Sequence, residues 1–107
     1  MQPANIVYTL QAENDLDLIF QYIAENSIMN ALKYIDKMKL IIEKLSTSPY
    51  IGVNCKSKGI NRDCRILIFE KYLIFYNYNE SDNEIKIIRI LHGSRKYLDL
   101  MQTYNNE

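Results

Sequence analysis

The side chains best suited to chemistry lie near the ends of two predicted strands in the C-terminal half of the chain. His92 is the only histidine, and an imidazole with an ordinary pKa of about 6.5 can act as an acid or a base near neutral pH. Arg65 can hold a phosphate oxygen through charge-assisted hydrogen bonds. Arg65 begins one strand and His92 ends another, so antiparallel neighbours could bring them to the same region of the sheet. The other polar groups available are Arg89, Arg95 and Tyr97.

Each of these residues also has a purely structural interpretation. A single histidine at a strand end is more often a surface or structurally bonded residue than a catalyst. Arg65 can close the sheet by bonding a carboxylate or a backbone carbonyl. Arg89 lies in the middle of a strand, where we expect an internal salt bridge or a place on the rim. With one histidine and two cysteines, no four-ligand zinc site can be assembled from soft ligands, and we expect neither metal nor cofactor.

Basic residues gather in the middle of the chain, although the formal net charge is zero. The first 30 residues contain four acidic residues and no lysine or arginine, whereas residues 33–65 contain eight basic and three acidic residues. Within that stretch, a loop carrying Lys56, Lys58 and Arg62 is a candidate contact for an acidic partner or for nucleic acid. Ordinary lysines on a solvated surface explain the same pattern equally well.

The length and the cysteine content limit the class of protein. A chain of 107 residues fits a single domain, residues 1–107. No apolar run approaches the roughly 20 residues of a membrane-spanning helix, and the first five residues lack the basic and apolar regions of a signal peptide. We therefore expect a cytoplasmic protein without membrane contact. In a reducing cytosol, Cys55 and Cys64 are expected to be free thiols.

A first amphipathic helix is predicted directly after Thr9, whose hydroxyl can cap the helix N-terminus. Apolar residues then recur at three- and four-residue spacings, which places them on one stripe facing the core. These residues are Ala12, Leu16, Ile19, Phe20 and Ile23. The pattern predicts that Asp15, Asp17 and Gln21 point mostly to water.

A second, longer helix is predicted from about Ile28 to Ser46. Asn26-Ser27 interrupts the first pattern and supplies a new N-cap, and Pro49 lies just beyond the predicted end, where it prevents the helix from continuing. The second helix has the clearest periodicity in the chain, formed by Ala31, Ile35, Met38, Ile42 and Leu45. Because the linker is short, the two helices must form an antiparallel hairpin.

Three antiparallel strands are predicted in the C-terminal half. The middle one, Tyr72–Tyr78, is almost wholly aromatic and β-branched, as is typical of a strand buried on both faces. Arg65–Phe69 is joined to it by Glu70-Lys71, a connection short enough to require a hairpin. Ile85–Leu91 follows the polar loop of residues 79–83. Both alternating sets of residues in this last strand mix charged and apolar side chains, so the pattern leaves its inward face open.

Together these elements predict an α+β fold of the order β-α-α-β-β-β. Ile6-Val7-Tyr8 is too short to stand alone and is expected to add an edge strand to the sheet. The helix hairpin is expected to pack on one face of a mainly antiparallel sheet. Residues 96–101 form either a short terminal helix or a mobile segment.

An ordered set of residues runs through most of the chain, from about Ile6 to Lys96. Its members are Ala12, Asp15-Leu16, Ile19, Tyr22-Ile23-Ala24, Ala31, Leu45, Pro49-Tyr50-Ile51-Gly52, Arg65, Tyr72-Leu73-Ile74-Phe75-Tyr76 and Ile88-Arg89-Ile90-Leu91-His92-Gly93-Ser94-Arg95. Their order and spacing together resemble the ParE branch of the RelE/ParE toxin superfamily. The resemblance implies a small bacterial toxin of a type II toxin–antitoxin module, neutralised by a cognate antitoxin whose extended C-terminal segment wraps it.

The resemblance allows two kinds of target. ParE-like members are reported to inhibit DNA gyrase and are not known to be nucleases, whereas RelE-like members cleave mRNA on the ribosome. The ending His92-Gly93-Ser94-Arg95 is similar to that of ParE, not to the tyrosine- or lysine-rich endings of the active nucleases. Cleavage of RNA would need a base, an acid and cations converging on one phosphate, and Arg65 and His92 would be the residues concerned.

The preferred hypothesis is therefore a toxin that acts by binding DNA gyrase and is not an enzyme. Its candidate target-binding residues are His92, Arg95, Tyr97, Lys56, Lys58 and Arg62. One alternative is a ribosome-dependent mRNA endoribonuclease, and another is an inactive member that only binds its antitoxin. The assembly could be a homodimer or a toxin–antitoxin hetero-oligomer.

Overall fold

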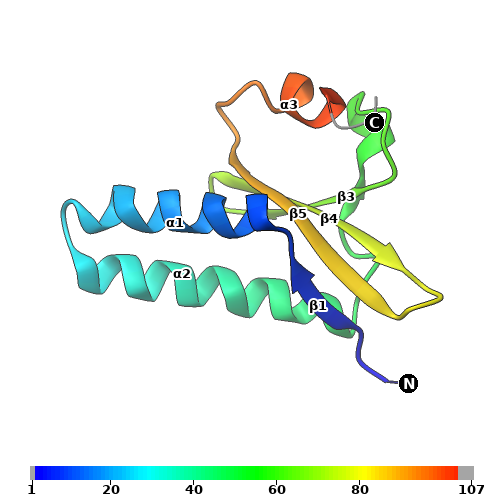
Figure 1. Ribbon diagram of the computed structural model, residues 1–107, viewed down its shortest axis with the longest axis horizontal. Helices are drawn as coiled ribbons and strands as arrows, with labels where there is room; N and C mark the ends of the chain where they lie inside the picture. Colours follow the sequence, from blue (N-terminus) through cyan, green and yellow to red (C-terminus); the bar gives the residue numbers. More distant parts are fainter. Residues whose placement is uncertain (1, 104–107) are drawn as a thin grey trace.

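The computed structural model describes residues 2–103, which form a five-stranded sheet with a helix hairpin on one face and a short helix on the other (Figure 1). The strands are β1 (Asn5–Tyr8), β2 (Val53–Asn54), β3 (Arg65–Phe69), β4 (Tyr72–Asn79) and β5 (Glu84–His92). The α-helices are α1 (Leu10–Ala24), α2 (Ile28–Glu43) and α3 (Tyr97–Thr103), and the two 3-10 turns are η1 (Lys44–Ser46) and η2 (Cys55–Lys58). The predicted α+β fold is confirmed, with β2 as an additional two-residue strand.

Both N-caps predicted for the helix hairpin are present. The Thr9 hydroxyl accepts a hydrogen bond from the Ala12 N–H at 3.0 Å, and the Ser27 hydroxyl accepts one from the Asn30 N–H at 3.1 Å. These bonds satisfy N–H groups that have no partner within the first helical turn. The second helix is shorter than predicted, because its last turn tightens into η1 before Pro49.

The strand order in the sheet is β1-β5-β4-β3-β2. The pairs β2–β3, β3–β4 and β4–β5 are antiparallel, and β1 pairs with β5 in parallel. The N-terminal strand is therefore an edge strand, as predicted, and it lies beside the last strand of the chain. This arrangement makes β5 the strand that links the N-terminal and C-terminal halves.

A β-bulge in β5 explains why its inward face could not be chosen from the alternation of side chains. Phe75 pairs with Arg89 and Tyr76 pairs with Ile87, so Ile88 is an extra residue. An extra residue reverses the alternation of side chains beyond it. As a result, apolar side chains occupy both faces of β5, with Ile87 in the core under the hairpin and Ile88 in the core on the other face.

The larger core lies between the helix hairpin and the sheet. It contains the predicted stripe residues of both helices except Phe20 and Ala31, and Met38 and Ile42 are completely buried. The helix residues in this core are Ala12, Leu16, Ile19, Met38 and Ile42, and the sheet residues are Phe69, Ile74, Tyr76, Ile85, Ile87 and Ile90. Burial of apolar surface, at about 25 cal/mol per Å², is the main force that holds the hairpin on the sheet.

A second core lies on the opposite face of the sheet, under α3 and the η2 loop. It is formed by Cys55, Ile60, Cys64, Ile66, Phe75, Ile88, Leu91 and Met101. Met101 is completely buried there, so of the two alternatives for the segment after β5, the short terminal helix is correct. The side chain of Met101 holds α3 on the sheet together with Tyr97 and Leu100, which pack against the same core.

The prediction of two free thiols is wrong, because Cys55 and Cys64 form a disulfide. The Cys55 N–H donates to the Cys64 carbonyl at 2.9 Å, and the two Cα atoms are 5.3 Å apart, within the usual range for a disulfide. The prediction failed because it considered only the redox compartment, whereas the hairpin between β2 and β3 places the two cysteines side by side. The bridge fixes the base of the η2 loop.

Candidate interaction site

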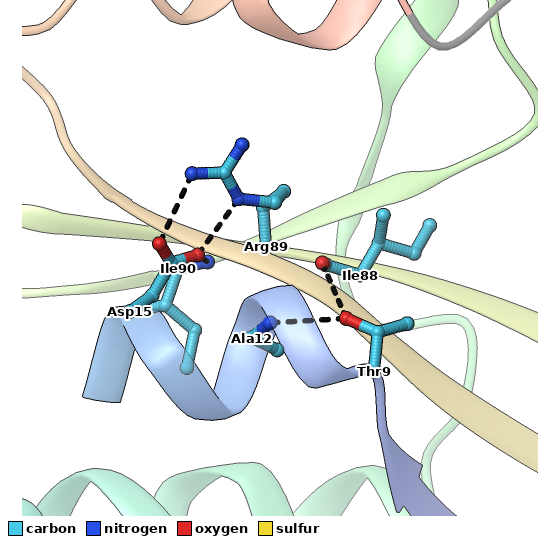
Figure 2. Close-up of polar contacts among 6 residues, drawn as sticks. All are labelled: Thr9, Ala12, Asp15, Ile88, Arg89 and Ile90. Atoms are coloured by element: carbon cyan, nitrogen blue, oxygen red, sulfur yellow. Dashed lines mark hydrogen bonds and ion pairs between the residues drawn. The ribbon is translucent and has the colours of Figure 1, made fainter. Parts of the chain in front are cut away.

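A buried ion pair fastens α1 to β5 (Figure 2). Arg89 donates to both oxygens of Asp15, from Nε at 2.8 Å and from Nη2 at 3.0 Å. The N–H of Ile90 donates to the same carboxylate at 2.9 Å. Asp15 is only 6% exposed, so the prediction that it points to water is wrong, whereas the internal salt bridge considered for Arg89 is confirmed. The carboxylate occupies the stretch of the β5 edge that β1 leaves uncovered.

Thr9, the N-cap residue of α1, makes a second connection to β5, six residues before Asp15. Its N–H donates to the Ile87 carbonyl at 3.0 Å, and its hydroxyl donates to the Ile88 carbonyl at 2.8 Å while it caps the helix. Figure 2 shows this hydroxyl between Ile88 and the first turn of α1. The bulge in β5 is therefore held by a side chain from the start of the helix, and the end of β5 has a fixed position against α1.

A hollow of about 630 Å³ opens between α1, α2, the start of β4 and the end of β5. We call it the tyrosine groove, because Tyr22, Tyr34 and Tyr72 line it. The other lining residues are Asp15, Leu18, Ile19, Ile23, Asn30, Glu70, Lys71, Ile90, His92 and Arg95. Of the six predicted target-binding residues, this groove contains His92 and Arg95.

The walls of the tyrosine groove are aromatic and partly solvent-exposed. Leu18 is 60% exposed and Tyr22 is 72% exposed. Tyr34 contacts Tyr72 edge to face, with the ring centroids 6.1 Å apart. Burial, reinforced by nearby Glu70, raises the pKa of Tyr34 to about 12, so its hydroxyl stays protonated at neutral pH. Apolar rings with neutral hydroxyl groups are typical of surfaces that bind other macromolecules.

His92 is held by its neighbours on two sides. Its ring meets Tyr72 edge to face with 5.3 Å between centroids, and Nδ1 accepts a hydrogen bond from the Ser94 N–H at 3.1 Å. The Ser94 hydroxyl lies 2.7 Å from the same nitrogen. Because Nδ1 accepts from a backbone N–H, the neutral ring carries its proton on Nε2. The imidazole thus fixes the turn that carries Arg95.

Arg65 and His92 are not brought together. Arg65 pairs with Tyr76 and His92 pairs with Tyr72, on opposite sides of β4 and about 13 Å apart along it. The prediction that Arg65 and His92 meet in one region of the sheet is wrong. β3 and β5 are both antiparallel to β4, so they run parallel to each other. The start of one strand and the end of the other therefore lie at opposite ends of the sheet.

Arg65 closes the edge of the sheet, which is the structural role considered for it. Its guanidinium donates from Nη1 to the Gly52 carbonyl at 2.8 Å and to the Tyr50 carbonyl at 3.3 Å. It also lies over the Tyr50 ring, 5.1 Å from the centroid. These contacts tie the loop before β2 to β3.

The remaining predicted target-binding residues lie on the opposite face from the helix hairpin. Tyr97, the first residue of α3, packs near Phe75, and the two ring centroids are 6.1 Å apart. Lys56 and Lys58 are exposed on η2, and Arg62 is half-buried in the same loop. The six predicted residues therefore form two groups, separated by the sheet.

Sequence reasoning missed most of the residues that line the tyrosine groove. Leu18 and Tyr22 lie outside the buried stripe of α1 and are four residues apart, so they share one face of the helix. That second apolar pair was a signal for an exposed binding surface. Glu70 and Lys71 reach the groove because they form the β3–β4 hairpin turn, which was predicted without a functional role.

Residues 2–103 contain no group of three or more His, Cys, Asp or Glu side chains that could bind a metal ion. None of the described helices is both long and apolar enough to cross a membrane.

Comparison with known proteins gives a family, and the similar structures include two toxin–antitoxin systems. Residues 6–97 match the family model described as ParE toxin of type II toxin-antitoxin system, parDE. The RelBE2 toxin–antitoxin complex from Mycobacterium tuberculosis has a chain with a TM-score of 0.55 and 17% identity, with 84% of this chain and 98% of that chain covered. The chromosomal ParDE system from P. aeruginosa gives a TM-score of 0.57 and 22% identity, with 83% and 95% covered. No curated protein sequence matches. The two structural likenesses show a shared fold.

Proposed function

The chain belongs to the ParE family of toxins of type II toxin–antitoxin systems, and from this membership we propose that it arrests growth by binding DNA gyrase and is held inactive by a cognate antitoxin. The action proposed is binding, without covalent chemistry on the target. Both similar structures are described as toxin–antitoxin systems, which supports a cognate antitoxin as partner.

The tyrosine groove is the observation that carries the proposal. It combines exposed apolar side chains, Leu18 and Tyr22, with the cations Lys71 and Arg95. Aromatic residues and arginine are the side chains that contribute most to protein–protein binding energy. His92 supports this surface structurally, because its Nδ1 is occupied by the Ser94 N–H.

A second candidate function, cleavage of mRNA on the ribosome, keeps one observation in its favour. His92, Arg95 and Lys71 line the same hollow, and an imidazole with two cations is a combination that phosphate chemistry uses. A mechanism in which Arg65 and His92 act on one phosphate is not supported, because the two residues lie at opposite ends of the sheet. In a nuclease, Nε2 of His92 would have to serve as the acid or base, because Nδ1 accepts the Ser94 N–H.

A gyrase supercoiling assay with purified toxin tests the first candidate. We expect inhibition by the wild-type protein, and Arg95→Glu and Tyr22→Ala should each raise the concentration for half-inhibition at least tenfold, since binding hot spots are worth about 2 kcal/mol or more. Lys44→Glu, a charge change at an exposed residue of η1 outside the groove, is the matched control and should inhibit like the wild type. Absence of inhibition at a large molar excess of toxin would refute the gyrase assignment.

A translation assay separates the remaining alternatives. Cleavage of mRNA within codons by the wild-type protein, abolished in His92→Ala but not in Lys44→Glu, would establish the nuclease. Normal growth after strong induction without antitoxin would instead indicate a member that binds antitoxin but is inactive on any target.

A further inference from the structure

A polar hollow of about 310 Å³ opens beside the β-bulge of β5. Lys86 of β5 and its partner Asn77 of β4 both line it. Their neighbours Ile87 and Tyr76 lie in the core under the helix hairpin. Because side chains alternate along a strand, Lys86 and Asn77 point to the opposite face of the sheet. Ile88, which is buried on that same face, also lines the hollow.

The other side of the hollow is formed by the loop that the disulfide closes. Arg62 and Asp63 line it, directly before Cys64, which is bonded to Cys55. The Asn77 side chain donates from Nδ2 to the Asp63 carbonyl at 3.0 Å. The Cys64 N–H donates to the Arg62 carbonyl, also at 3.0 Å. These bonds fix the segment against β4, so the hollow is preformed, as small-molecule sites usually are.

The charged groups around the hollow are two cations and one carboxylate. Arg62 is half-buried, whereas Lys86 and Asp63 are exposed. Gln11, in the first turn of α1, and Asn77 contribute amide groups. A guanidinium, an ammonium and amide N–H donors together are a set of groups that binds phosphate oxygens. The net positive charge favours an anion over a neutral ligand or a cation.

The volume of the hollow exceeds that of a phosphate ion alone. At about 30 Å³ for each water-sized group, 310 Å³ has room for roughly ten such groups, and the atoms of one phosphate would fill about half of it. The remaining space suits the organic part of a phosphate ester. Ile88 offers that part an apolar contact.

Two exposed lysines extend the positive charge beyond the hollow. Lys56 and Lys58 lie on η2, in the same disulfide-closed loop as Arg62. A nucleic-acid backbone carries a negative charge at every phosphate, so it could contact these lysines while one of its phosphates occupies the hollow. A mononucleotide would use the hollow alone.

We propose that this hollow binds the phosphate group of a phosphate ester, with Arg62 and Lys86 on the phosphate oxygens. Gln11 and Asn77 supply further N–H donors, and the negative charge of Asp63 limits the affinity. The ester is either a small molecule such as a mononucleotide or the backbone of a nucleic acid. The sheet separates this site from the tyrosine groove, so the inference goes beyond the proposed function and holds whichever target the groove binds.

An NMR titration of the whole protein tests this assignment. It is run at a pH of about 7.5, well above the second pKa of a phosphate ester at about 6. The probes are adenosine monophosphate and a short single-stranded oligothymidylate, and sodium chloride at matched ionic strength is the control. Adenosine monophosphate should shift the amide signals of Gln11, Asp63, Asn77 and Lys86 saturably, whereas sodium chloride should not.

Variants separate the charges of the site from the integrity of the fold. Arg62→Gln and Lys86→Gln should each weaken binding of adenosine monophosphate at least about tenfold. Lys44→Gln, at an exposed residue of η1 outside the hollow, is the matched control and should bind like the wild type. Asp63→Asn should tighten binding about threefold, because it removes a like charge. A misfolded protein cannot produce that gain.

A double variant identifies the source of the phosphate. Tighter binding of the oligothymidylate than of adenosine monophosphate, with the advantage lost in Lys56→Gln/Lys58→Gln, would assign the site to nucleic acid. Equal affinity for the two probes, unchanged in the double variant, would assign it to a small phosphate ester. Both results support the site.

Three outcomes would overturn the proposal. Adenosine monophosphate could cause no saturable shift at millimolar concentration, or the same shifts could persist in Arg62→Gln/Lys86→Gln, which would place the phosphate elsewhere. Weaker binding by Asp63→Asn would contradict the electrostatic argument.

Discussion

Removal of the Asp15 carboxylate tests the most consequential contact in the fold. Asp15→Ala leaves the Arg89 guanidinium, whose side chain is only 12% exposed, without its carboxylate. It also removes the acceptor of the Ile90 N–H. Breaking one partner of a buried ion pair costs about 3–5 kcal/mol, and an unsatisfied buried N–H costs about 1–3 kcal/mol. The two losses overlap, so we expect a total of about 3–5 kcal/mol.

The expected loss is large for a domain of this size. Single domains are stable by about 5–15 kcal/mol, and each kcal/mol corresponds to roughly 4–8 °C in Tm for a chain of about 100 residues. Alanine has the higher helix propensity, by at most about 0.7 kcal/mol, which cannot offset the loss. The midpoint of urea unfolding should therefore fall sharply while the slope of the transition stays the same.

Matched variants separate the charge from the hydrogen bond. Asp15→Asn keeps an oxygen for the Ile90 N–H and should lose less stability than Asp15→Ala. Asp17→Ala, two residues along on the exposed face, should change stability by no more than about 0.5 kcal/mol. The double variant Asp15→Leu/Arg89→Met should be more stable than Asp15→Ala, because no charge is left unpaired. A loss below about 1 kcal/mol for Asp15→Ala would refute the reasoning that the β5 edge depends on this carboxylate.

Three further predictions concern the rest of the fold. Tyr76→Phe should cost about 1–3 kcal/mol in urea unfolding, because the hydroxyl accepts from the Gly52 N–H at 2.9 Å and donates to the Pro49 carbonyl at 2.8 Å; an unchanged midpoint would contradict this. Gly52→Ala should also destabilise, since a Cβ there would lie 2.7 Å from the buried Tyr76 ring, and a wild-type Tm would show that the ring can move. Reduction of the disulfide should lower stability by about 2–3 kcal/mol for so short a loop, and Cys64→Ala should no longer respond to reductant.

Alkaline pH provides a fourth prediction. The pKa of Tyr8 is raised from 10.0 to about 12, so the folded protein holds the phenolic proton more tightly than the unfolded chain does. Its contribution to stability is therefore complete below pH 10 and is lost as the pH rises toward 12. Urea midpoints measured across this range should fall less steeply for Tyr8→Phe than for the wild type, and parallel curves would contradict the assignment.

The elements that depend on local signals could be predicted from the sequence. Thr9 and Ser27 cap the helices as expected, because capping needs only residues three positions apart. The middle strand was recognisable from its aromatic and β-branched composition. By contrast, β2 has two residues and no pattern of its own, and it exists because β3 provides an edge to pair with. The bulge at Ile88 likewise has no local signal, since Thr9, at the other end of the chain, holds it in place.

The candidate site was predictable only in part. His92 and Arg95 line the tyrosine groove, but the six predicted residues do not form one surface, because the sheet separates them. Asp15 was predicted to point to water, because an amphipathic pattern places charged residues on the exposed face of a helix. Its partner, Arg89, lies 74 positions away, and a contact of that range is not visible in a periodic pattern.

The parallel pairing of β1 with β5 bears on when this protein can become active during its synthesis. β5 supplies the surface for β1, the anchors for the start of α1 and one wall of the tyrosine groove, yet it is translated after both helices of the hairpin and after the other four strands. Until residues 84–92 have emerged from the ribosome, the helix hairpin has only part of a sheet to pack on, and the apolar stripes of the hairpin stay uncovered. A nascent chain that ends before β5 therefore lacks one wall of the groove, which Ile90 and His92 provide.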